Sequence, residues 1–146
     1  MIDASGPLTE AKIRVRLAAE LAHEKDHGIQ YWPIFLKSSS EFAGCCGLRP
    51  YRPEDAVYEL GFHLRPQFWR QGLAEEAARA VVEYAFADLG ARALFAGHHP
   101  ENVGSKRLLE KLGFRNTGLV FYPPTGLDHP SWLLSREIWS AHEPLH

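Results

Sequence analysis

Cysteine, methionine, excess charge and long apolar runs are all scarce in this sequence. Its only cysteines are the neighbours Cys45 and Cys46, and it has one methionine in 146 residues. Adjacent side chains on a strand point to opposite faces, so a bridge between these two thiols would need unusual geometry. No activating partner marks either one as a nucleophile. We therefore expect two reduced, structural thiols.

The charge balance and the hydropathy exclude two classes of partner. A net charge of −2 and a pI near 6.4 argue against a broad nucleic-acid surface. No apolar run approaches the roughly 20 residues that span a bilayer, and the first residues lack the basic start of a secretory signal. The sequence thus predicts a soluble, cytoplasmic protein that binds neither nucleic acid nor membrane.

The length and the periodicity predict one α/β domain over residues 1–146. At 146 residues with 45% hydrophobic content, a single core is expected. Hydrophobic spacing, caps and turn residues predict nine elements. They are a helix at 9–27, strands at 29–36, 42–51 and 56–64, a helix at 72–89, a strand at 93–98, a helix at 102–112, and strands at 115–122 and 131–138. Hairpins and helical crossovers both occur, so a mixed sheet covered by helices is expected.

One strand-to-helix connection has the residues that a phosphate requires. A strand ending at Leu64 leads to Arg70, Gln71 and Gly72, which open the long helix. Helix starts present unpaired N–H groups and the positive end of the dipole. Gly72 lets a phosphate approach the backbone, and Arg70 can add a charged contact. Taken alone, the same residues fit an ordinary turn with a surface arginine.

Two ordered motifs resemble the GNAT superfamily of N-acetyltransferases. The stretch Trp69-Arg70-Gln71-Gly72-Leu73-Ala74 resembles motif A, which holds the coenzyme A pyrophosphate, although Trp69 replaces the usual Gln or Arg. Residues 99–114 resemble motif B, in which Asn102 contacts the cofactor. The aromatic-rich strand end before the loop is similar to the corresponding strand end in the ribosomal-protein N-terminal acetyltransferase branch of the family.

The resemblance implies a fold and a cofactor. The fold is a mixed, mostly antiparallel sheet flanked by helices, whose splayed central strands are those at 56–64 and 93–98. Acetyl-coenzyme A lies between them, and no metal is implied. Backbone N–H groups near Phe62, His63 and Leu64 polarise the thioester carbonyl. The first strand and helix of the family are missing, which leaves strand 29–36 at the sheet edge and favours a homodimer through this edge or through the C-terminal strands.

The resemblance also implies candidate acids and bases for direct transfer. Glu59 occupies the position of the carboxylate that takes the amine proton, and His63, on the same strand face, is an alternative base. The tyrosine that often protonates the thiolate is replaced by Leu109. Ser105 is placed as a substitute acid, with ordinary helix capping as its other interpretation, and Tyr122 is a weaker candidate.

The histidines carry less information. His23 and His27 have the i, i+4 spacing of metal ligands, but no third ligand is evident, and a surface role is expected. His98, His99 and His129 flank the predicted cleft and are possible acceptor-pocket groups.

The sequence therefore predicts transfer of acetyl from acetyl-coenzyme A to a primary amine, either a protein N-terminus or a small molecule. A non-catalytic acyl-coenzyme A-binding module or sensor of the same fold is the alternative.

Overall fold

The computed structural model describes residues 2–3, 6–7 and 29–142, and the helix predicted for residues 9–27 lies outside them. Strands β1 (Ile2–Asp3) and β2 (Gly6–Pro7) pair with each other. The other strands form one six-stranded sheet: β3 (Tyr31–Phe35), β4 (Phe42–Arg52), β5 (Val57–Leu64), β6 (Ala93–Gly97), β7 (Arg115–Tyr122) and β8 (Leu127–Ser135).

Helices α2 (Leu73–Glu83), α3 (Val103–Lys111) and α4 (Arg136–His142) connect or follow these strands. The π-helical segment η3 (Tyr84–Asp88) continues α2, and the short turns η1 (Pro53–Asp55) and η2 (Pro66–Phe68) flank β5. None of the helices in the described part of the chain is both long and apolar enough to cross a membrane.

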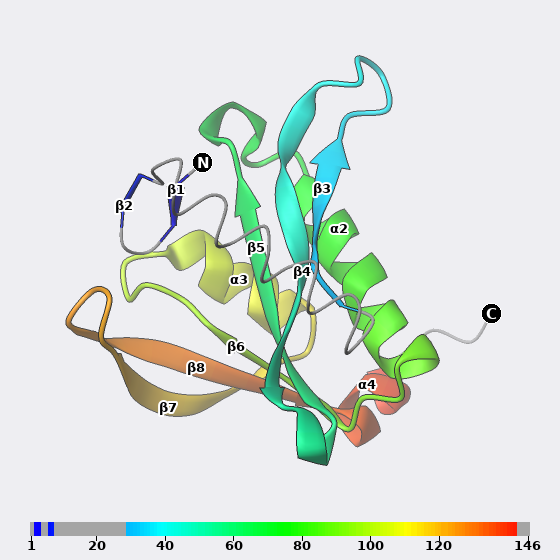
Figure 1. Ribbon diagram of the computed structural model, residues 1–146, viewed down its shortest axis with the longest axis vertical. Coiled ribbons are helices and arrows are strands. Elements are labelled where there is room, and N and C mark those ends of the chain that lie inside the picture. The colour runs from blue at the N-terminus through cyan, green and yellow to red at the C-terminus, as the bar shows by residue number, and fades with distance from the viewer. Residues whose placement is uncertain (1, 4–5, 8–28, 143–146) are drawn as a thin grey trace.

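The sheet has the order β3-β4-β5-β6-β8-β7, and all neighbours are antiparallel except β5 and β6 (Figure 1). The hairpins β3–β4 and β7–β8 give antiparallel pairs, whereas α2 carries the chain from β5 to a parallel neighbour. The mixed, mostly antiparallel sheet confirms the predicted fold class.

The core lies on one face of the sheet, beneath α2 and α3. Leu48, Leu60 and Leu94, from three adjacent strands, are at most 2% exposed, and Phe86 and Leu109 reach them from the helical side. Burial of side chains of this size contributes roughly 1.5–3 kcal/mol each. The alternating residues of the same strands face the opposite side, where the polar groups discussed below gather.

Local signals set the helix ends. Gly90 and Gly113 take the left-handed φ values of 70° and 93°, and the Asn102 side chain accepts a hydrogen bond at the start of α3. The helical segments therefore end close to the predicted bounds of 72–89 and 102–112. The two cysteines form no disulfide bridge with each other, as expected, and Cys46 is buried in the core.

The C-terminal elements correct one prediction. The last strand was expected at 131–138, but β8 begins at Leu127 and ends at Ser135, where α4 takes over. Gly126, at φ 70°, closes the turn earlier than the turn-rich composition suggests. The Ser135 hydroxyl accepts from the Ile138 N–H, and Arg136 donates to the carbonyl of Ala91. These contacts favour a helix where the apolar pattern alone favours a strand.

Candidate active site

A loop with two left-handed residues connects β5 to α2. After η2, Arg70 has φ 63° and Gly72 has φ 76°. The indole N–H of Trp69 donates to the Leu64 carbonyl at 2.9 Å, which fastens the loop to the end of β5. The sequence-predicted residues 69–74 therefore form one continuous turn into the helix. Trp69 holds the loop through its side chain, a contact that the motif alone does not indicate.

The start of α2 has the features of an anion site. Gly72 is the N-cap and provides no side chain to cap the helix. The Glu76 N–H donates to the Gly72 carbonyl, and this is the first backbone hydrogen bond of the helix. The first-turn N–H groups of Leu73 and Ala74 are thus available to a ligand. A Cβ built at Gly72 would meet no protein atom within 4 Å. The loop therefore fits a pyrophosphate, because the left-handed turn leaves open space where a side chain would stand.

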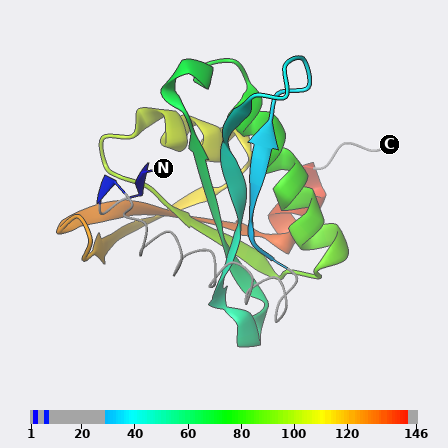
Figure 2. The ribbon, with the colours of Figure 1, turned by 45° about the horizontal axis from the view of Figure 1, so that its top comes forward.

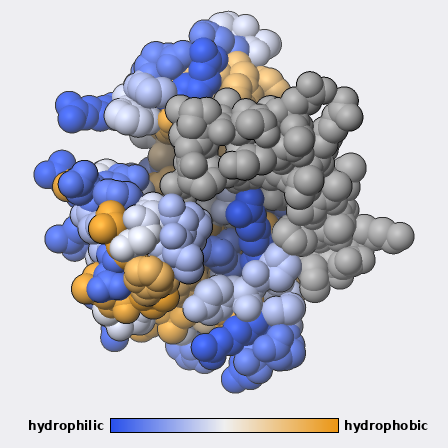
Figure 3. Space-filling view, turned by 60° about the vertical axis from the view of Figure 1, so that its left-hand side comes forward, coloured by the Kyte–Doolittle hydropathy of each residue, from blue (hydrophilic) through white to orange (hydrophobic). Residues whose placement is uncertain are grey.

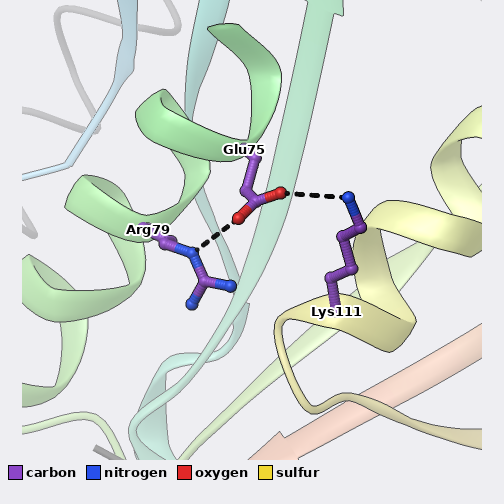
Figure 4. Close-up of polar contacts among 3 residues, drawn as sticks. All are labelled: Glu75, Arg79 and Lys111. Atoms are coloured by element: carbon purple, nitrogen blue, oxygen red, sulfur yellow. Dashed lines mark hydrogen bonds and ion pairs between the residues drawn. The ribbon is translucent and has the colours of Figure 1, made fainter. Parts of the chain in front are cut away.

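Negative charge beside this site is compensated. Glu75, in the first turn of α2, contacts Arg79 at 3.0 Å and Lys111 of α3 at 3.5 Å (Figure 4). The hydrogen bond from Arg79 is the main reason that the pKa of Glu75 is lowered. The three groups carry a net positive charge and join the two helices. Because they are largely exposed, their effect on stability is small.

The sheet forks between β5 and β6. Only three residue pairs join these two parallel strands, and the last of them is Glu59 with Phe95. Beyond it, β5 continues to Leu64 and stays paired with β4. Figures 1 and 2 show the two strands running apart beyond this point. One edge of residues 60–64 is therefore left without a partner from β6, as the splayed strands of the resemblance imply. An extended ligand fits beside it as an additional strand.

Glu59 lies at the vertex of this fork. It is half-buried, and burial raises its pKa, while the opposing charge of Arg49 acts in the other direction. Arg49 is its cross-strand partner on β4. His63 lies on the same face of β5, four residues on, and is exposed. A carboxylate with a raised pKa at the end of a fork is suited to accept a proton.

The start of α3 lies on the other face of the sheet. Asn102 Oδ1 accepts the Ser105 N–H at 2.9 Å, so this side chain caps the helix. Ser105 is 8% exposed, and within the described part of the chain the hydrogen bond to Asn102 is made by its backbone N–H, not by its hydroxyl. Leu109 is 1% exposed and packs in the core. The structure therefore separates Ser105 from Glu59 and His63, which lie across the fork.

Three histidines meet beyond the end of β6. His98 Nδ1 donates to the His99 carbonyl at 2.8 Å, and its Nε2 accepts from the Trp132 indole at 3.0 Å, which fixes the tautomer. His129 contacts the Thr125 hydroxyl at 2.7 Å, and its ring lies 5.7 Å from that of His99. Burial is the main reason that the pKa of His129 is lowered, with His99 and His98 adding to it. Sequence alone could not place this cluster.

Sequence reasoning missed two residues, Tyr31 and Arg49, on the face of the sheet that carries Glu59. They lie on β3 and β4 beside Glu59, and the Arg49 guanidinium is 4.4 Å from the centre of the Tyr31 ring. The available signal was a pair of strand glycines, Gly47 and Gly61, because strand glycines often mark the close approach of another group.

In the described part of the chain, no group of three or more acidic, histidine or cysteine side chains is arranged so that it could hold a metal ion, the three histidines above included. His23 and His27 lie outside the described residues.

The forked sheet, the glycine loop and the open helix start define the class of protein. Residues 2–115 match the family model described as Acetyltransferase (GNAT) domain. The chain therefore belongs to the GNAT acetyltransferase family.

Relatives and solved structures agree with this assignment. The uncharacterized N-acetyltransferase YoaA of Bacillus subtilis is 32% identical over 113 residues, which are 77% of this chain and 63% of YoaA. The FsC-acetyl coenzyme A-N(2)-transacetylase of Aspergillus fumigatus is 32% identical over 87 residues, which are 56% of this chain and 37% of the relative. The chain thus spans less than two thirds of either relative. A GNAT-family acetyltransferase from Bacillus anthracis matches with a TM-score of 0.75 at 26% identity, over 93% of this chain and 80% of that one.

Proposed function

We propose that this protein transfers the acetyl group of acetyl-coenzyme A to a primary amine, either a protein N-terminus or a small-molecule amine. The observation that carries the proposal is Glu59, a half-buried carboxylate with a raised pKa at the vertex of the fork. The resemblance to the ribosomal-protein branch stays a prediction, and the acceptor is named only by its chemistry.

Different residues bind the cofactor and transfer the protons. The loop from Arg70 to Ala74 binds the pyrophosphate through backbone N–H groups and the α2 dipole. Acetyl-coenzyme A supplies an activated thioester when it is bound. Backbone groups near Phe62 to Leu64 orient the thioester carbonyl at the unpartnered edge of β5. Glu59 accepts the amine proton, with His63 as the alternative base. Ser105, from the opposite face, is the candidate donor to the leaving thiolate.

A second function has one observation in its favour. The helix position that carries a tyrosine in many relatives of this fold is Leu109, which is packed in the core. A chain that lacks this acid could bind an acyl-coenzyme A without turnover, as a module or sensor. The two functions differ in one measurable product, the free thiol.

A thiol-release assay distinguishes them. Acetyl-coenzyme A is incubated with the protein and a panel of short peptides, polyamines and aminoglycosides. An enzyme releases free coenzyme A only with an acceptor present, and the acetylated acceptor appears in equal amount by mass spectrometry. Binding of acetyl-coenzyme A without release for every amine would support the sensor.

A further inference from the structure

The Tyr31 side chain lies across two strands of the sheet. Tyr31 is opposite Gly47 on β4, which is opposite Gly61 on β5. A Cβ at Gly47 would overlap the backbone of Gln30 and Tyr31, and a Cβ at Gly61 would overlap the Tyr31 hydroxyl. The glycine at 47 thus allows the close approach of β3 to β4, and the glycine at 61 leaves the space that the end of the Tyr31 side chain occupies. The Tyr31 side chain on the outer strand therefore reaches β5.

A positively charged side chain lies over the Tyr31 ring. The Arg49 guanidinium lies over it at 4.4 Å, a favourable cation–π distance. Arg49 is also the cross-strand partner of Glu59. Three adjacent strands thus contribute one functional group each, and Tyr31, Arg49 and Glu59 share one face of the sheet.

The hydroxyl lies beside the fork. Gly61 is two residues beyond Glu59 on the same face of β5, in the stretch that β6 no longer pairs. The Tyr31 hydroxyl therefore stands between Glu59 and His63, where an amine must approach a thioester held at this edge. Gly97, on the same face of β6 and two residues beyond Phe95, adds no side chain to this approach.

We propose that Tyr31 is an acceptor-binding residue that selects primary amines. The inference rests on the acetyl transfer proposed above. In the reactive complex one N–H of the neutral amine points to Glu59 and the second N–H donates to the Tyr31 hydroxyl. The nitrogen lone pair then forms the C–N bond, the C–S bond breaks with its electron pair on sulfur, and the first proton passes to Glu59. The second N–H is retained and becomes the amide N–H of the product.

This geometry has a consequence for specificity. A secondary amine replaces the second N–H with carbon, which leaves the hydroxyl without its donor and places a methyl group against it. A site built to hydrogen-bond a substrate N–H discriminates strongly against analogues that lack it. Tyr31→Phe keeps the ring beneath the Arg49 guanidinium, and it removes both the acceptor atom and the obstruction.

The test uses two coenzyme A derivatives and needs no identified acceptor. One carries the group S–CH2–CO–NH–propyl, and the other carries the same group with an N-methyl. Calorimetry with this 146-residue chain should show the N–H derivative binding about tenfold more tightly than the N-methyl derivative. The Tyr31→Phe variant should bind the two derivatives with affinities that agree within about threefold. It should bind coenzyme A itself with the wild-type affinity.

Two further variants control for folding and for the loss of a hydroxyl as such. Tyr51→Phe removes a hydroxyl from a ring stacked on Phe95 at 4.3 Å and should keep the wild-type ratio. Gly61→Ala displaces the intact Tyr31 side chain and should abolish the ratio. Equal affinities of the wild type for both derivatives, or an unchanged ratio in a folded Tyr31→Phe variant, would overturn the inference. Absence of thiol release with every amine would instead count against the proposed function.

Discussion

Gly72 and Gly90 share a backbone conformation but lie at opposite ends of the same helical segment. Their φ values are 76° and 70°, and a Cβ at either would meet no protein atom within 4 Å. A side chain at either site therefore has a similar conformational cost, on the order of 1–2 kcal/mol, and no protein clash. Only Gly72 lies in the proposed pyrophosphate loop, so Gly90 is its matched control.

We predict that Gly72→Val weakens acetyl-coenzyme A binding at least tenfold, because the new side chain occupies the space of the phosphate. Gly90→Val should lose similar stability and bind acetyl-coenzyme A as the wild type does. Isothermal titration and thermal denaturation of both variants measure the two effects. Wild-type affinity in Gly72→Val would remove the loop from the cofactor site.

Glu59→Gln tests the proton acceptor. We expect turnover at neutral pH to fall by about 10²-fold or more, with acetyl-coenzyme A affinity nearly unchanged, because only proton removal is lost. Steady-state kinetics and titration calorimetry separate the two quantities. An unchanged pH–rate profile would transfer the role to His63 or to water.

The same variant has a consequence for stability that needs no acceptor. Because burial raises the folded-state pKa of Glu59 above its usual value of 4.5, the folded state holds its proton more strongly than the unfolded state. Wild-type stability is therefore lost as the pH rises from below 4.5 through the folded pKa. The melting temperature of Glu59→Gln relative to the wild type should rise between pH 4 and pH 7. A difference that is independent of pH would contradict the raised pKa.

At the scale of elements, the β7–β8 hairpin holds the histidine cluster against the end of β6. His129 is 8% exposed, next to the Tyr122 ring at 4.6 Å and the Thr125 hydroxyl. The hairpin thus places imidazole and phenol groups on the Glu59 face. The stability of this hairpin is expected to depend on pH, because burial disfavours protonation of the His129 imidazole.

We predict that His129→Gln flattens the acid side of the stability curve. The folded-state pKa of His129 is lowered from 6.5, so its contribution is complete above pH 6.5 and is lost as the pH falls through the folded pKa. Chemical denaturation at pH 8 and pH 5 should show a smaller loss of stability for the variant than for the wild type. Parallel losses would mean that another group governs this range.

At the scale of the whole molecule, the two outer strands of the six-stranded sheet, β3 and β7, differ. β3 has five residues and contains Pro33, which cannot donate a ladder hydrogen bond. β7 has eight residues, no proline, and the exposed side chains Leu119 at 65% and Phe121 at 59%. Figure 3 shows apolar surface on the side of the molecule that carries this hairpin. An exposed apolar edge strand recruits another strand more readily than an interrupted one.

We therefore propose that two copies pair along β7, and we predict that Leu119→Lys gives a monomer where the wild type is a dimer. Phe35→Lys, a comparable change on β3, where Phe35 is 57% exposed, should leave the dimer intact. Light scattering at micromolar concentration reads out both variants. A wild-type monomer at high micromolar concentration would exclude the dimer, and dissociation by Phe35→Lys alone would move the interface to β3.

The sequence by itself determined the features that depend on neighbouring residues. The strand-to-helix opening at Gly72, the Asn102 cap and the glycine stops could be predicted because caps and left-handed turns are set by a few adjacent residues. The periodicity also identified every strand of the six-stranded sheet, although it placed the ends of β8 wrongly and did not predict the two-residue strands β1 and β2. Glu59 and His63 could be assigned to one face because alternation along a strand is local.

Only the tertiary structure decided which distant groups meet. Periodicity along a strand says nothing of its register with a neighbour, so the approach of Tyr31 to Gly61 and the pairing of Arg49 with Glu59 could not be predicted. The point where β5 and β6 separate, and the meeting of His99 with His129, likewise depend on how separate elements pack. The sequence named the loop that fits a phosphate, whereas the acceptor side of the fork is formed by contacts between strands far apart in the chain.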